Sequence, residues 1–124
     1  MSEQPSEPRS AAGATELLSA VRFQEELRRV ACFGSRVLVG DPLAAAVRKI
    51  TQNPAFTQSR LLARILSALT YQEGDFRRAE VSALDSDTLS LVITLMDAYA
   101  AGTSAREKWI GAVDEVQATL LGAQ

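Results

Sequence analysis

Apolar residues recur with the 3.6-residue period of an α-helix along most of the chain. The pattern is strongest from Thr88 to Ala101, where large apolar side chains fill nearly every position. Only Ser90, Thr94 and Asp97 interrupt it, at helical spacing. A helix that is apolar almost all round is typical of the centre of a bundle. We expect these three polar residues to share a solvated stripe, or Asp97 to pair with an arginine.

A second segment, from Asn53-Pro54 to about Thr70, is amphipathic. Arg60, Arg64 and Ser67 fall on one side of the helix that it predicts. The apolar stripe on the other side consists of Leu61, Leu62, Ile65, Leu66 and Leu69. The pattern therefore predicts a helix with one buried face and one face in water.

Capping residues indicate where further helices begin and end. Asp41 precedes Pro42, which is a favourable cap and first helical residue, and Asp75 and Asp85 are placed as caps of later helices. Ser104 and Glu107 have the spacing of a capping box. The predicted helices run from about Thr15 to Gly34, Pro42 to Thr51, Pro54 to Thr70, Phe76 to Leu84, Thr88 to Ala101, and from Ser104 through Leu120.

The two ends of the first predicted helix adjoin less regular sequence. Residues 1–13 are rich in Ser, Glu and Pro and contain no large apolar residue, so we expect a disordered tail before a single helical domain, 14–124. Residues 35–40 fit a helix, a loop or the second strand of a hairpin, and the absence of other strand patterns favours the first two. The expected fold is all-α: a compact bundle of five or six short-to-medium helices.

Length and composition predict a soluble, cytoplasmic protein without a membrane segment. The chain has 124 residues, the size of one domain. Its longest apolar stretch without a charge, 88–96, is nine residues long, whereas a helix needs about 20 to cross a bilayer. The polar N-terminus lacks the apolar core of a secretory signal. The single Cys32 cannot form an intramolecular disulfide, and its apolar neighbours favour a buried, inert thiol.

The residue types that most catalytic and metal sites need are missing from the sequence. It contains no histidine and one cysteine, which excludes zinc sites and Ser–His–Asp or Cys–His catalysis. It has neither a phosphate-binding glycine loop nor a dinucleotide-binding motif. We therefore expect no enzyme activity, cofactor or bound metal.

Charge is distributed unevenly, although the net charge is only −2. Residues 22–78 carry ten basic and five acidic groups, and residues 79–124 carry two basic and seven acidic groups. The two segments can neutralise each other in the folded monomer, or they can form surfaces for a partner or for self-association. A helix-turn-helix spacing in 76–96 is rejected as a DNA-binding motif because its second helix would present Asp87 and no Lys or Arg.

These observations favour a small helical protein–protein interaction module, an adaptor or regulatory protein that binds another protein or forms a homo-oligomer. Its apolar content of 47% is high for so short a helical chain. Arg60, Arg64 and Trp109 are the expected partner-binding residues, with core packing as the alternative for Trp109. The alternative function is a nucleic-acid-associated accessory protein that uses the basic segment 22–78. Its phosphate contacts would be Arg28, Arg29, Arg48, Lys49, Arg77 and Arg78.

Overall fold

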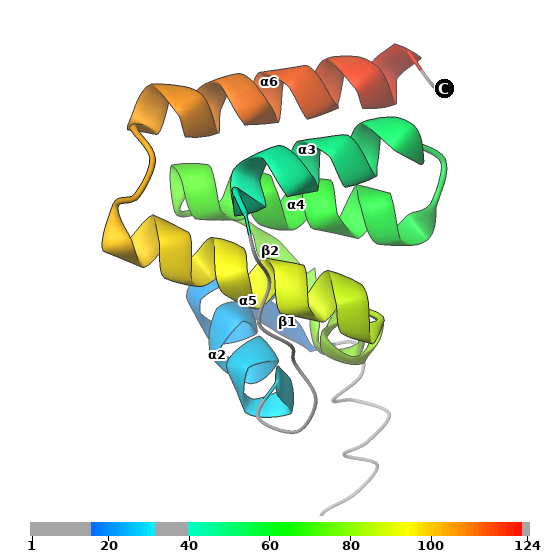
Figure 1. The fold of residues 1–124 in the computed structure, drawn as a ribbon. Helices are drawn as coiled ribbons and strands as arrows, with labels where there is room; N and C mark the ends of the chain where they lie inside the picture. The colour runs from blue at the N-terminus through cyan, green and yellow to red at the C-terminus, as the bar shows by residue number, and fades with distance from the viewer. Residues whose placement is uncertain (1–15, 32–39, 123–124) are drawn as a thin grey trace, which may run out of the picture.

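Helices make up most of the computed structural model, which describes residues 16–31 and 40–122 (Figure 1). The five α-helices of this part are α2 (Ala20–Ala31), α3 (Pro42–Gln52), α4 (Thr57–Tyr71), α5 (Ser86–Ala101) and α6 (Arg106–Gly122). Two short strands, β1 (Leu17–Ser19) and β2 (Asp75–Arg77), and a 3-10 helix, η1 (Arg78–Ser82), are also present. The prediction of an all-α bundle of five or six helices is confirmed.

Some sequence predictions concern residues outside these ranges. They are the tail, residues 1–13, the buried thiol of Cys32, the helix stop at Gly34 and the conformation of residues 35–39. These stay predictions.

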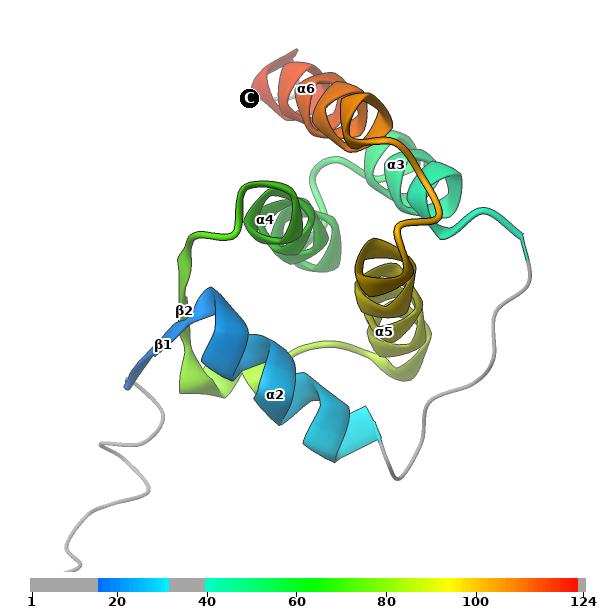
Figure 2. The same cartoon turned by 90° about the vertical axis from the view of Figure 1, so that its left-hand side faces the viewer.

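Helix α5 lies between α2 and α3 and also packs against α4 (Figure 2). Val92 and Leu95 of α5 are fully buried, so the prediction of a central helix is confirmed. Ser90 is fully buried as well. The prediction of a solvated stripe is wrong at that position because α5 is covered on several sides. Asp97 is exposed and pairs with Arg28 of α2 across 2.8 Å, which is one of the two environments expected for it.

Helix α6 lies across α3 and α4 and closes one side of the core (Figure 1). The predicted apolar stripe is confirmed, since Trp109, Val113 and Val116 are buried and Leu120 is partly buried. The helix begins at Arg106, so the residue directly before it is Ala105. Ser104 therefore does not occupy the N-cap position that the predicted capping box requires.

Strands β1 and β2 form an antiparallel pair in which Leu18 lies opposite Phe76. Both side chains are 2% exposed, whereas the residues on either side of each are exposed, as the alternation of a strand requires. Two helix predictions are therefore corrected. The helix predicted from Thr15 begins at Ala20, and the segment predicted as a helix from Phe76 to Leu84 is β2 followed by η1. Strands of three residues are too short for their alternation to stand out from a helical pattern.

The start of α4 also differs from the prediction, because it begins at Thr57 and not at Pro54. Asn53 instead ends α3: its backbone N–H donates to the carbonyl of Ile50 and its side-chain amide to that of Lys49. With Asn53 used in this way, the N-cap position of α4 falls to Phe56, which makes no side-chain capping bond.

The N-cap of α5 is Asp85, whose carboxylate accepts a hydrogen bond of 2.8 Å from the backbone N–H of Thr88. This bond and the positive charge of Lys49 outweigh partial desolvation and lower the pKa of the Asp85 carboxyl. We predict that Asp85→Ala lowers the free energy of unfolding by about 1 kcal/mol at pH 7, whereas Asp85→Asn, which still caps, costs much less. Urea denaturation measures both variants.

The stabilisation by Asp85 depends on pH in a direction that its lowered pKa fixes. A carboxyl with a lower pKa in the folded state stabilises fully above its unfolded-state pKa, about 3.9, and this contribution is lost as the pH falls through the folded-state value. The deficit of Asp85→Ala relative to wild type should therefore be constant from pH 7 to 5 and shrink below about pH 4. A deficit that is unchanged at pH 3 would contradict the assignment.

Candidate functional site

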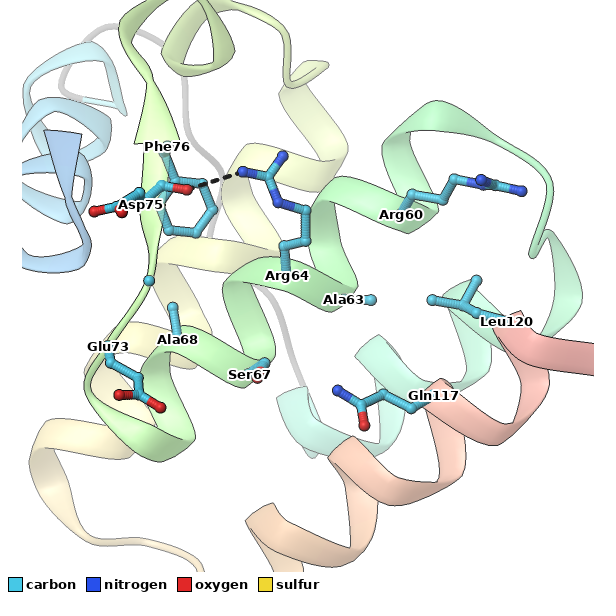
Figure 3. A pocket seen from close by; sticks show the side chains of 11 residues that line it. Arg60, Ala63, Arg64, Ser67, Ala68, Glu73, Asp75, Phe76, Gln117 and Leu120 are labelled. Atoms are coloured by element: carbon cyan, nitrogen blue, oxygen red, sulfur yellow. Dashed lines mark hydrogen bonds between the residues drawn. The ribbon is translucent and has the colours of Figure 1, made fainter. Parts of the chain in front are cut away.

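A groove of about 540 Å³ runs along the exposed face of α4, between β2 on one side and the C-terminal half of α6 on the other (Figure 3). Small side chains form its floor, namely Ala63, Ser67 and Ala68. Phe76 of β2 lines one wall, and Gln117 and Leu120 of α6 line the other. Segments that lie far apart in the sequence therefore build a single concave surface.

The floor of the groove is the side of α4 on which the sequence placed Arg60, Arg64 and Ser67. Arg60 and Arg64 are exposed, Ser67 is partly buried, and all three line the groove. Because they are spaced by four and three residues, they fall on one helical face. The neighbouring Ala63 and Ala68 are almost fully buried, so nothing bulky fills the centre of this face.

Phe76 gives the β2 wall its rigidity. Its ring stacks on that of Phe23 in α2, with centroids 4.0 Å apart and an angle of 7° between the planes. The guanidinium carbon of Arg64 lies 4.9 Å from the centroid of the Phe76 ring. One aromatic side chain thus connects α2, β2 and α4.

Arg64 is held in place by contacts with β2 and η1. Its guanidinium forms an ion pair with Glu80 and donates a hydrogen bond of 3.0 Å to the carbonyl oxygen of Asp75. Partial burial of the Glu80 carboxyl opposes ionisation. Hydrogen bonds from Arg64 and from the backbone N–H of Arg77, with the charges of both residues, nevertheless hold the pKa of Glu80 below its ordinary value. The charge of Arg64 is therefore largely neutralised, and its contacts hold β2 beside α4.

Gly74 forms the turn between α4 and the β2 wall. Its φ of +139° lies in a region that L side chains rarely adopt. A Cβ atom at this position would also lie 3.4 Å from the Cβ of Ala68 and 3.7 Å from the ring of Phe76. The glycine lets the chain turn tightly enough for β2 to stand beside α4.

The two ends of the groove carry opposite charges. Arg60 lies near the N-terminal end of α4 and Glu73 just beyond its C-terminal end (Figure 3). Neither side chain forms an ion pair with another residue in the described ranges. Phe56, one turn before Arg60, is 62% exposed, and Leu121, next to Leu120, is 70% exposed. Exposed apolar side chains therefore lie close in sequence to two residues of the groove lining, Arg60 and Leu120.

Trp109, the third predicted contact residue, lies in the core. It is 2% exposed and packs edge-to-face against Tyr99, with ring centroids 5.2 Å apart. This position agrees with core packing, the alternative prediction for Trp109. We therefore do not retain Trp109 as a contact residue.

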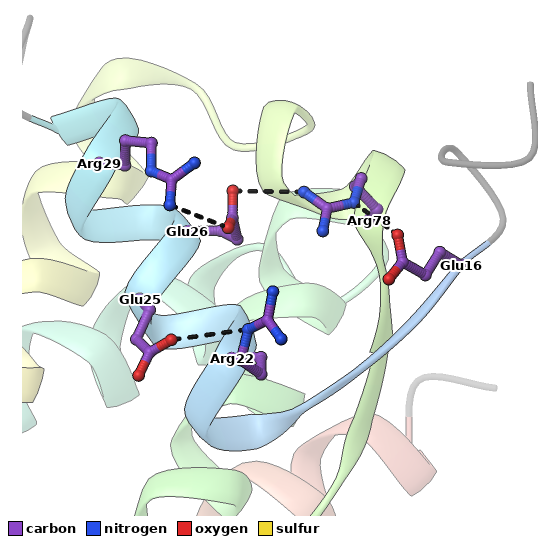
Figure 4. Close-up of polar contacts among 6 residues, drawn as sticks. All are labelled: Glu16, Arg22, Glu25, Glu26, Arg29 and Arg78. Atoms are coloured by element: carbon purple, nitrogen blue, oxygen red, sulfur yellow. Dashed lines mark hydrogen bonds and ion pairs between the residues drawn. The ribbon is translucent and has the colours of Figure 1, made fainter. Parts of the chain in front are cut away.

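Half of the basic residues proposed for nucleic-acid binding are paired with carboxylates. Arg28 pairs with Asp97 on α5. In the network of Figure 4, Arg78 bridges Glu16 at 3.0 Å and Glu26 at 3.3 Å, and Arg29 approaches Glu26 at 3.6 Å. A phosphate would have to compete with these partners.

The other three members of that set are dispersed. Arg48 and Lys49 lie on α3, and Arg77 is the last residue of β2, where its charge acts on Glu80. The six basic residues thus come from several elements and do not repeat the clustering that they show in the sequence. The fold gives this alternative no specific support.

In residues 16–31 and 40–122, no group of three or more His, Cys, Asp or Glu side chains could hold a metal ion. None of the helices in this part is both long and apolar enough to span a bilayer.

No protein-family model matches the chain, and no curated protein or solved structure is significantly similar to it.

Sequence reasoning found the floor of the groove but missed its walls. Phe76 was expected inside a helix, and Glu73 and Gln117 were not singled out. The groove depends on the pairing of β1 with β2 and on the packing of α6, which are contacts between distant segments. Asp75 was interpreted as a helix cap, although the glycine before it, Gly74, is also typical of a turn.

The two groove arginines should differ in their contribution to stability. Arg64→Ala removes an ion pair with a partly buried carboxylate, a hydrogen bond and a contact with an aromatic ring. We expect it to lower the free energy of unfolding by roughly 1–2 kcal/mol, after allowance for the half-exposed guanidinium. Arg60→Ala should change it by less than about 0.5 kcal/mol. Chemical denaturation at pH 7 measures both, and equal losses would contradict the assigned contacts.

Proposed function

We propose that this protein is a protein–protein interaction module that binds a helical segment of a partner protein in the α4 groove. The observation that carries the proposal is a concave floor of small side chains, Ala63, Ser67 and Ala68, between two fixed walls. Small residues let a second helix approach closely, since the distance between packed helices, 8–10 Å, depends on the side chains at the contact.

The length of the groove also suits a helix. The α4 residues that line the groove run from Arg60 to Ala68, and at 1.5 Å per residue about 12 Å of helix separates them. This span equals about two helical turns. A docked helix would present residues at positions i, i+3 or i+4, and i+7 to such a floor, which is the usual pattern of helix-in-groove recognition.

The groove is prepared for binding before any partner arrives. Arg64 is already fixed by Glu80 and Asp75, and Phe76 by Phe23. A rigid surface loses little conformational freedom on association, so more of the contact energy is available for affinity. The exposed Phe56 at the end of the groove adds apolar area of the kind found at interfaces.

A selection from displayed natural protein segments tests the proposal. We expect helical segments to be enriched that bind the wild-type protein with micromolar Kd. Ser67→Trp, which fills the floor, should weaken their binding at least tenfold. Thr51→Trp is the matched control, because Thr51 lines a separate hollow between α3 and α6. Circular dichroism establishes that both variants are folded.

Two outcomes would contradict the proposal. Enriched segments that bind Ser67→Trp as tightly as wild type would place the interaction elsewhere. A wild-type dimer in light scattering that Ser67→Trp converts to a monomer would mean that a second copy of this chain, and not a foreign segment, covers the groove.

A further inference from the structure

Charge changes along the groove from positive near the N-terminus of α4 to negative near its C-terminus. At one end stands Arg60, which has no ion-pair partner among the described residues. The first turn of α4 at this end has neither an acidic residue nor a side-chain capping bond, so the positive end of the helix dipole is not compensated there. Both features make this end attractive to negative charge.

The opposite end of the groove is negative. Glu73 lies just beyond the C-terminus of α4, which has no basic residue of its own in the last turn. Arg106 of α6 donates a hydrogen bond of 2.8 Å to the carbonyl oxygen of Thr70, so the negative end of the α4 dipole is partly compensated and the charge of this end rests on the Glu73 carboxylate. Asp75 also lines the groove, but it lies beside Arg64 and its carboxylate points away from α4 (Figure 3). Arg64, in the middle, contributes little net charge because Glu80 neutralises it.

From this polarity we infer that the partner segment is a helix that docks antiparallel to α4, with acidic residues at its C-terminal end over Arg60 and basic residues at its N-terminal end near Glu73. The inference rests on the proposed function and adds the charge pattern and direction of the ligand. The partial negative charge at the C-terminus of the docked helix would lie near Arg60 and the uncompensated N-terminus of α4, which favours this orientation.

Helix α6, which forms the other wall of the groove, packs antiparallel to α4. Along α6, Gln117 lies beside Ser67, and Leu120 lies closer to Ala63 and Arg60 (Figure 3). Helix α6 therefore runs antiparallel to α4 along this wall. A docked helix of the inferred direction would run parallel to α6 and place its acidic end near the apolar surface around Phe56 and Leu121.

Two designed peptides of identical composition test the direction. Both carry Leu and Ala at the groove-facing positions and are stapled to equal helicity, with three Glu at one end and three Lys at the other. We expect the peptide with C-terminal Glu to bind about fivefold to tenfold more tightly than the reversed peptide at low salt. The preference should fall as salt is raised, because the charges are exposed. Isothermal titration calorimetry measures both affinities.

A charge exchange in the protein removes any effect of the peptides themselves. In the double variant Arg60→Glu/Glu73→Arg the preference between the peptides should invert, whereas Arg48→Glu on α3 should leave it unchanged. Equal binding of both peptides, inhibited by Ser67→Trp, would overturn the inferred direction and leave the proposed function standing. A preference that survives the exchange, or no binding of either peptide, would also overturn the inference, and the segment selection then decides the proposed function separately.

Discussion

The stacking of Phe76 on Phe23 is the contact on which the rest of the groove depends. Phe76 is the central residue of β2, lies opposite Leu18 of β1 and carries the guanidinium of Arg64 over its ring. Burial of such a ring contributes about 1.5–3 kcal/mol, and an aromatic pair adds about 0.5–1.5 kcal/mol. The tight turn before Phe76 requires Gly74, because the φ of +139° at that position is one that L side chains rarely adopt.

Because the aromatic pair fixes the β2 wall, the two arginines of α4 can have different roles. Arg64 faces the β2 wall, forms an ion pair with Glu80 and donates a hydrogen bond to the carbonyl oxygen of Asp75. Arg60, one turn earlier, lies beyond the reach of β2 and keeps its charge available. An arginine with structural contacts thus follows an arginine that we propose for recognition on the same helical face, and the sequence pattern alone does not distinguish the two.

The sequence pattern was informative where periodicity within one segment decides the structure. The burial of α5, the cap and first turn of α3, and the exposed side of α4 with Arg60, Arg64 and Ser67 were all predicted from spacing. It failed where contacts between distant segments decide. Leu18 and Phe76 belong to strands only because they pair with each other, and neither three-residue segment has a strand pattern of its own. Trp109 shows a different limit, since its helical spacing fits both core packing and surface contact.

Ion pairs within the fold offset part of the uneven charge of the sequence. Arg28 with Asp97 and Arg64 with Glu80 connect the basic middle segment to the acidic final segment, as neutralisation within the folded monomer requires. Arg78 and Arg29 pair with Glu26, which belongs to the same basic segment, residues 22–78. Within the groove, Arg60 and Glu73 lie at opposite ends and form no ion pair with other described residues.

The most direct test of helix binding in the α4 groove is the change in backbone amide chemical shifts when a selected helical segment is titrated into the labelled protein. If the segment binds there, the largest changes fall along the groove, at Ala63, Ser67 and Gly74 and at Gln117 across from them. Changes concentrated at Thr51 and Gly111, in the hollow between α3 and α6, would contradict it.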